Sequence, residues 1–244
     1  MSWIVSLLAV IGLALAHVIA PSMRFLDGLP RSRWLSIAGG VSVAYVFLHL
    51  LPELGESQEV IAEAVGPAMA FVENHVYLLA LVGLAIFYGL DRLAMTSRRR
   101  ESGEDDKNST SKGVFWIHIG SFAIYNAIIG YLLLHREERG IGPLFLFWLA
   151  MALHFVVNDY GLREHHKQDY DRIGRWILVA AVVGGWLVGL AVEVDEAMIA
   201  VLIAFLAGGI ILNVLKEELP EQRESRFSSF AIGAGLYAVI LLAL

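Results

Sequence analysis

The sequence predicts an all-α polytopic membrane protein in which one domain of eight membrane-spanning helices uses nearly the whole chain. Three observations indicate this fold class. Of the 244 residues, 57% are hydrophobic and only 17% are charged, whereas soluble domains carry about 25% charged residues. Several apolar runs reach the roughly 20 residues that cross the hydrocarbon of a bilayer. The basic residues gather in alternate loops, as they do in polytopic membrane proteins.

Eight apolar segments are the expected spans. Each should be helical, because backbone groups find no other hydrogen-bond partners in lipid. The segments cover residues 3–20, 34–52, 75–95, 114–134, 143–161, 173–192, 196–215 and 227–244. We interpret the first segment as a span and not as a signal peptide, because no Lys or Arg precedes its apolar run.

The distribution of basic residues predicts the orientation. The loops after the first, third, fifth and seventh segments, with the segment ends beside them, contain every Lys and Arg except Arg136 and Arg139. Since positive charge stays on the cytoplasmic side, we expect these loops inside and both termini outside. The expected location is a bacterial inner (plasma) membrane.

Two polar loops differ in character. Residues 96–112, "TSRRRESGEDDKNSTSK", lack apolar periodicity, which predicts a flexible cytoplasmic linker between a three-helix front and a five-helix back. The second loop is rich in glutamate and faces outward in this topology. It is interpreted either as an acidic vestibule that attracts cations or as a solvated loop.

An internal similarity suggests two inverted halves. "AGGVSVAYVFLHLLPEL" at 38–54 is similar to "AGGIILNVLKEELPEQ" at 207–222. By the expected topology the two segments run in opposite directions, which is typical of inverted-repeat transporters. The alternative is that the Gly-Gly pairs only let helices pack closely.

The fifth segment carries polar residues at mid-depth. His154 lies 11 residues after Pro143, which is about 16 Å along a helix. His154 and Asn158 share a helix face because they are four residues apart, and Asp159 is adjacent. On the fourth segment, Ser121 and Asn126 reach the same depth.

Ionisable groups inside a span indicate function by default. Imidazole, carboxylate and amide oxygens suit Zn²⁺, Fe²⁺ or Mn²⁺. The sequence therefore predicts a metal site formed by His154, Asn158, Asp159, Ser121 and Asn126. The alternative is a structural polar cluster that joins two helices.

Other polar residues are weaker candidates, placed at the ends of the path. His49 and Glu53 end the second segment at the outer face in this topology, where they guard an entrance or cap the helix. His118 and Glu218 lie toward the inner face, as exit or interfacial residues.

These motifs resemble the ZIP (Zrt-, Irt-like) family of divalent metal transporters. "HLLPE" at 49–53 is similar to the end of that family's second helix. "LHFVVNDYG" at 153–161 resembles its fifth-helix motif HExPHE. "SFAIYNAIIG" at 121–130 stands where its fourth-helix motif HNxPEGxxxG is expected. The resemblance implies eight helices in a 3+2+3 order and transport of a divalent metal into the cytoplasm.

The chain departs from the family at the ligand positions. Phe155 replaces an acid, Asn158 and Asp159 replace a His-Glu pair, and Ser121, Phe122 and Tyr125 stand at the His, Asn and Glu positions of the fourth helix. Two readings follow. One is a transporter with a single rebuilt site, and the other is a non-transporting ZIP-like scaffold or regulatory protein that has lost the metal centre.

Partners and cofactors follow from these readings. We expect membrane lipid and a divalent metal ion as partners, the metal being transported substrate with no permanently bound cofactor. No nucleic acid is expected. The small-residue seam of Gly185 and Gly189 should pack either internally or against a second copy in a homodimer. A metal-dependent hydrolase would need at least three good ligands around an open coordination position. The only candidates are His118, His154 and Asp159, and His118 lies about two turns too shallow, so we expect no enzyme activity.

Overall fold

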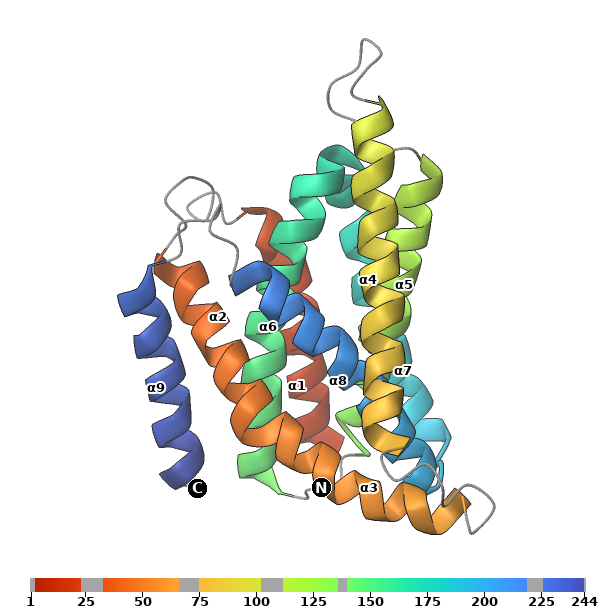
Figure 1. Ribbon diagram of the computed structural model, residues 1–244, viewed down its shortest axis with the longest axis vertical. Coiled ribbons are helices and arrows are strands. Elements are labelled where there is room, and N and C mark those ends of the chain that lie inside the picture. The colour runs from red at the N-terminus through yellow and green to blue at the C-terminus, as the bar shows by residue number, and fades with distance from the viewer. Residues whose placement is uncertain are drawn as a thin grey trace.

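The computed structural model describes residues 3–22, 33–65, 75–101, 112–135, 140–218 and 226–243. Across these residues the chain is helical and contains no strand, as expected for the fold class. The two ends of the chain lie at the same end of the helix bundle (Figure 1).

The helices are named in chain order. They are α1 (Trp3–Ile19), α2 (Arg33–Tyr45), α3 (Leu51–Val65), α4 (His75–Glu101), α5 (Lys112–Leu132), α6 (Ile141–Asp169), α7 (Arg175–Ala191), α8 (Glu196–Glu218) and α9 (Phe227–Ala243). A short 3₁₀ turn, Ala20–Ser22, follows α1, and the π-helical segments Val46–Leu50 and Tyr170–Gly174 join α2 to α3 and α6 to α7.

Six stretches of the described chain are long and apolar enough to span a membrane. They are Arg33–Ile61, Val76–Ser97, Gly113–Leu132, Ile141–Arg163, Tyr170–Ala191 and Glu196–Lys216. Two shorter apolar helices, Trp3–Ile19 and Phe227–Ala243, coincide with the first and last expected spans. At 17 residues each, they are at the lower limit of length for a transmembrane helix.

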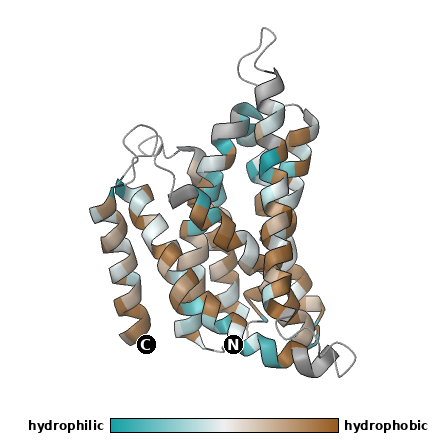
Figure 2. Cartoon of the chain, viewed as in Figure 1, coloured by the Kyte–Doolittle hydropathy of each residue, from teal (hydrophilic) through white to brown (hydrophobic). Residues whose placement is uncertain are grey.

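The bundle is apolar outside, and its largely apolar interior also contains polar groups. Large apolar side chains are exposed on its outer helix faces, among them Leu8, Ile124, Leu236 and Val239, each more than 60% exposed. Figure 2 shows hydrophobic residues along much of the length of the visible helices. The buried residues include several histidines, asparagines and aspartates. This distribution fits a lipid-facing surface, where only the interior satisfies polar groups.

The predicted end of the second span at residue 52 is wrong. Helical structure continues through the π-helical segment into α3 and reaches Val65. In this segment the N–H of Leu51 donates to the carbonyl of Val46, five residues back. The wider turn accommodates Pro52, which has no N–H and would clash with a regular helix. Figure 1 shows α3 turning across the end of the bundle.

Two further boundaries differ from expectation. The fifth loop is absent from the described chain as a separate coil, because α6 continues to Asp169 and the π-helical segment leads directly into α7. Figure 1 shows α6 and α7 running in opposite directions on either side of this turn. The expected linker 96–112 begins later than predicted, since α4 reaches Glu101 and α5 begins at Lys112. Residues 102–111 lie outside the described ones.

Glycines mediate the closest packing of α2 on α9. A Cβ at Gly40 would collide with the carbonyl oxygen of Phe230, and a Cβ at Gly233 would collide with that of Ile37. Each backbone thus lies against the other because neither carries a side chain at the crossing. We call this reciprocal arrangement a glycine clasp.

The second Ala-Gly-Gly segment makes the same clasp. A Cβ at Gly208 on α8 would collide with the carbonyl oxygen of Ala80 on α4, and one at Gly83 would collide with that of Phe205. The spacing is also the same in both clasps. On each helix, the carbonyl that faces the partner's glycine belongs to the residue three positions before that helix's own glycine. The similarity between 38–54 and 207–222 therefore extends to how each segment packs.

The seam on α7 packs internally. A Cβ at Gly185 would collide with the carbonyl of Ala127 on α5, and Gly130 faces the carbonyl of Val182 in return. Gly189 lies against the side chain of Leu134. Between the two packing modes expected for this seam, the structure shows contact within the chain.

Candidate functional site

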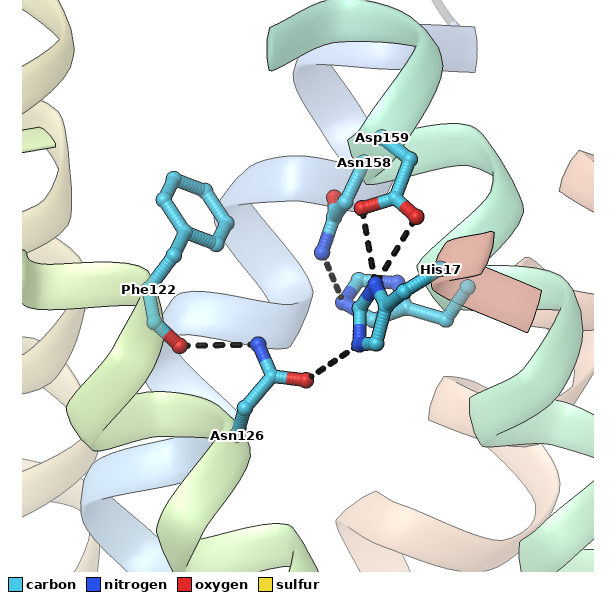
Figure 3. A network of polar contacts seen from close by, with 6 residues as sticks. His17, Phe122, Asn126, Asn158 and Asp159 are labelled. Atoms are coloured by element: carbon cyan, nitrogen blue, oxygen red, sulfur yellow. Dashed lines mark hydrogen bonds and ion pairs between the residues drawn. The ribbon is translucent and has the colours of Figure 1, made fainter. Parts of the chain in front are cut away.

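A buried ion pair joins the first helix to the sixth. The Nδ1 of His17 lies 2.8 Å and 3.0 Å from the two carboxylate oxygens of Asp159, and each residue is 1% exposed. His17 is in the last turn of α1 and Asp159 is in the middle of α6 (Figure 3). Packing of α1 on α6 brings together two residues that are 142 positions apart.

Asn126 of α5 extends this pair into a network of three helices. Its Nδ2 donates to the carbonyl of Phe122 at 2.8 Å, so its Oδ1 is the atom that faces Nε2 of His17, also at 2.8 Å. Figure 3 shows these contacts in one chain from Asp159 through His17 to Asn126. We call His17, Asp159 and Asn126 the central network.

The hydrogen bonds determine the charge of the central network. His17 faces an amide oxygen through Nε2 and carboxylate oxygens through Nδ1, so each contact needs a proton between its atoms. An imidazolium beside a carboxylate supplies both protons, and so does a neutral imidazole beside a protonated Asp159. In either case the pair carries no net charge, which lowers the cost of burying it.

A second polar group lies on the adjacent face of α6. The Nε2 of His154 is 2.8 Å from the hydroxyl of Tyr125 and 2.9 Å from Nδ2 of Asn158. The amide nitrogen of Asn158 only donates, so Nε2 of His154 accepts and its imidazole is neutral. The lone pair that would bind a metal is therefore already occupied by protein donors.

The predicted metal ligands thus divide into two groups. His154 and Asn158 share a face and interact, as the spacing of four predicted. Asp159 and Asn126 belong instead to the central network, because adjacent helix positions point about 100° apart. Ser121 joins neither group, since its hydroxyl donates to the carbonyl of His118 on its own helix at 2.7 Å.

Aromatic side chains fill the space around both groups. Phe155 stacks on His17 with ring centroids 4.5 Å apart. Phe122 and Tyr125 both pack edge-on against Phe87 of α4, at 5.9 Å and 5.5 Å. Two of the residues at ligand positions of the resembled family, Phe122 and Phe155, therefore act as packing groups.

The entrance and exit candidates belong to the π-helical segment Val46–Leu50 and to α3, α5 and α8. His49 belongs to the π-helical segment and stacks near Tyr45 at 5.3 Å, and Glu53 follows in the first turn of α3. Neither ends a helix, which corrects their predicted position. On α5, Nδ1 of His118 contacts Nε2 of His166 on α6 at 3.0 Å. The side chain of Glu218 is outside the described residues.

Sequence reasoning missed His17 and misplaced His166. His17 was open to discovery, because it is the one ionisable residue in the apolar run "WIVSLLAVIGLALAHVIA". His166 was expected in a cytoplasmic loop, where it could catch an exiting metal or belong to a solvated turn, whereas it lies on α6 and contacts His118. Both depend on contacts between helices that are distant in sequence.

No group of three or more His, Cys, Asp or Glu side chains is close enough to hold a metal ion within the described ranges.

The chain matches no protein-family model, and no curated protein matches it in sequence.

Proposed function

We propose that this chain is a membrane transporter with a ZIP-like 3+2+3 arrangement that moves a divalent cation of the Zn, Fe or Mn class into the cytoplasm. The observation that carries the proposal is the buried ionisable pair of His17 and Asp159 between apolar helices. The transported ion crosses mid-depth beside His154 and Asn158, between α5 and α6.

The energetic argument favours function over structure for this pair. Removing an ion pair from water costs several kcal/mol for each ion, and well-packed apolar residues of similar volume are often as stable or more so. A protein that only needed to join α1, α5 and α6 would do so with apolar side chains. Ionisable residues inside spans generally mark ion pathways or relays.

The paired glycine clasps support the transporter architecture. In an inverted repeat, the first three spans correspond to the last three, so α2 corresponds to α8 and α4 to α9. The α2–α9 clasp is then the counterpart of the α4–α8 clasp. Inverted repeats of this kind generate two-sided access around a central site. Each clasp uses one glycine of an Ala-Gly-Gly sequence, the second glycine in 38–40 and the first in 207–209.

The proposed orientation follows from charge. The two chain ends lie at one end of the bundle, and the basic residues concentrate in the loops of the opposite end by the order of the helices. By the positive-inside rule, the termini face outward in a bacterial inner membrane.

Binding requires rearrangement of the side chains described above. Nε2 of His154 becomes a ligand only when Tyr125 and Asn158 release it. Asn158 then has an amide oxygen to offer, and Asp159 is the nearest carboxylate along α6. The ligand set is poor in charge, which predicts weaker binding of a dehydrated dication than an acidic two-metal site gives.

Uptake into proteoliposomes tests the proposal. Zn²⁺, Mn²⁺, Fe²⁺ and Cd²⁺ are compared in one series with wild-type protein, His154→Ala and His154→Gln. We expect saturable uptake of at least one ion by the wild type and at least a tenfold loss in both variants. His135→Ala is the matched control, because His135 contacts the carbonyl of Gly189 outside the polar centre.

A second candidate is a non-transporting ZIP-like scaffold or regulatory protein. The aromatic packing of Phe122 and Phe155 favours it, as does the lack of a three-ligand group among the described residues. Folded wild-type protein that takes up none of the four ions would support this candidate and overturn the transporter proposal.

A further inference from the structure

Two small hollows lie along the contact of α5, α6 and α8. The first is lined by apolar residues that include Ile129, Met151 and Ile210, with Glu53 as its one carboxylate. The second is more polar and is lined by His118, Phe122, Asn158, Gly161, Leu162, Asn213 and Lys216. We call them the outer and inner hollows, from the orientation proposed above. Each hollow has space for about one water molecule.

The contact of Tyr125 with His154 separates the two hollows. On α5, Ile129 of the outer hollow lies one turn after Tyr125, and Phe122 of the inner hollow lies about one turn before it. On α6, Met151 precedes His154 by about one turn and Asn158 follows it by one turn. Both helices therefore place the 2.8 Å contact of Tyr125 and His154 between the hollows.

The third helix, α8, also passes from one hollow to the other near the level of the Tyr125–His154 contact. A Cβ at Gly209 of α8 would lie 3.3 Å from the ring of Tyr125, so the ring packs closely on this glycine. The adjacent Ile210 lines the outer hollow, and Asn213, one turn further on, lines the inner one. Tyr125 is fully buried and His154 is 2% exposed, and the two hollows share no lining residue.

The inner hollow contains an unused donor. Nδ2 of Asn213 has no hydrogen-bond partner among the described residues, and the side chain is 6% exposed. Leaving a buried polar group unsatisfied costs about 1–3 kcal/mol, and the hollow has space for about one water molecule. This part of the interior is suited to a single water molecule.

We propose that the Tyr125–His154 hydrogen bond is the gate of the transport route, and that cations pass from the outer hollow to the inner hollow when Tyr125 releases His154. The inference rests on the proposed transport function and assigns it a path and a gating residue. The central network of His17, Asp159 and Asn126 lies beside this route and is not a part of its lining.

The absence of cysteine from the chain makes the route directly testable. Met151→Cys and Asn213→Cys place one thiol in each hollow. Ag⁺ is added to one face of sealed vesicles, and the thiols left unreacted are labelled with a maleimide after solubilisation. We expect Ag⁺ at the outer face to protect the thiol at position 151 from the maleimide, and Ag⁺ at the inner face to protect the thiol at position 213.

The gate itself is tested with Tyr125→Phe, which removes only the hydroxyl. Loss of one buried hydrogen bond, about 1 kcal/mol, corresponds to roughly a fivefold change. In the Tyr125→Phe variant, we therefore expect the thiol at position 213 to react about fivefold faster with Ag⁺ added at the outer face than it does when Tyr125 is present. Tyr237→Phe is the matched control, because Tyr237 is equally buried but packs against Tyr45.

Three results would overturn the gate: both thiols reacting from the same face, neither reacting from any face, or Tyr125→Phe giving no greater change than Tyr237→Phe. Because thiol accessibility is measured without a transported metal, it is separable from the uptake assay. Opposite-face protection without uptake would reject the metal cargo, and uptake without opposite-face protection would place the route elsewhere.

Discussion

At the scale of single residues, the central network and the contacts of His154 are made of matched donors and acceptors. His17 satisfies the carboxylate of Asp159 and the amide oxygen of Asn126, and His154 accepts from Asn158. Such a network is stable only while every member is present, because low dielectric makes each unpaired group expensive. Both ring nitrogens of His17 face oxygen atoms, whereas Nε2 of His154 accepts through its lone pair, so the two histidines differ in role.

Breaking the ion pair should destabilise the protein more than removing it. We expect Asp159→Ala to lower the free energy of unfolding by about 3–5 kcal/mol, because it leaves His17 buried without its partner. The double variant with His17→Leu and Asp159→Leu should recover most of this loss. Thermal unfolding in detergent measures both.

The control for this pair is a partly exposed one. Asp171 pairs with Arg163 at 2.9 Å, and the two side chains are 39% and 29% exposed. Water screens this pair, so Asp171→Ala should cost less than about 1 kcal/mol. Equal losses in Asp159→Ala and Asp171→Ala would contradict the account of the buried pair.

Sequence spacing predicted part of the site and missed the rest for a definable reason. The interval of four correctly put His154 and Asn158 on one face, because that relation depends only on helix geometry. It could not place Asp159 opposite His17, since this contact depends on how α1 and α6 pack. Ser121 was misplaced because a serine in a helix can satisfy itself on its own backbone.

At the scale of helices, glycines determine how closely the elements approach. Gly40 and Gly208 stand at equivalent points of their clasps, and each lies against a carbonyl of the facing helix. Gly184 of α7 is different, because a Cβ there would meet nothing within 4 Å. The same residue type is thus required at some positions and dispensable at others.

Glycine-to-alanine substitutions should have opposite effects at these positions. Gly208→Ala forces α4 and α8 apart and should destabilise the protein by about 1–3 kcal/mol. Gly184→Ala should be neutral or stabilise by up to about 1 kcal/mol, because alanine favours a helix over glycine. Urea or thermal unfolding of the two variants in parallel measures the difference, and the same sign in both would contradict the packing described.

Helix boundaries were the least predictable feature of the elements. The apolar cores of the expected spans coincide with observed helices, since hydropathy over about 20 residues is a strong signal. The continuation of helix through Leu51–Val65 and up to Asp169 was missed. Those stretches lack a long apolar run, so hydropathy averaged over about 20 residues does not reveal them.

At the scale of the whole molecule, three features organise the bundle. Glycine clasps hold its helix pairs together, the central network joins α1, α5 and α6, and the two hollows lie along α5, α6 and α8. Composition predicted an apolar exterior, and the described residues agree. The arrangement of pairs could not be predicted from composition, because many packings bury the same area.

The most direct measurement for the account is the initial rate of Zn²⁺ uptake by wild-type proteoliposomes, set against protein-free liposomes and His154→Gln. The account predicts saturable uptake by the wild type that falls at least tenfold in His154→Gln, with both proteins equally folded. Uptake by His154→Gln at the wild-type rate would contradict the central claim that cations cross beside His154.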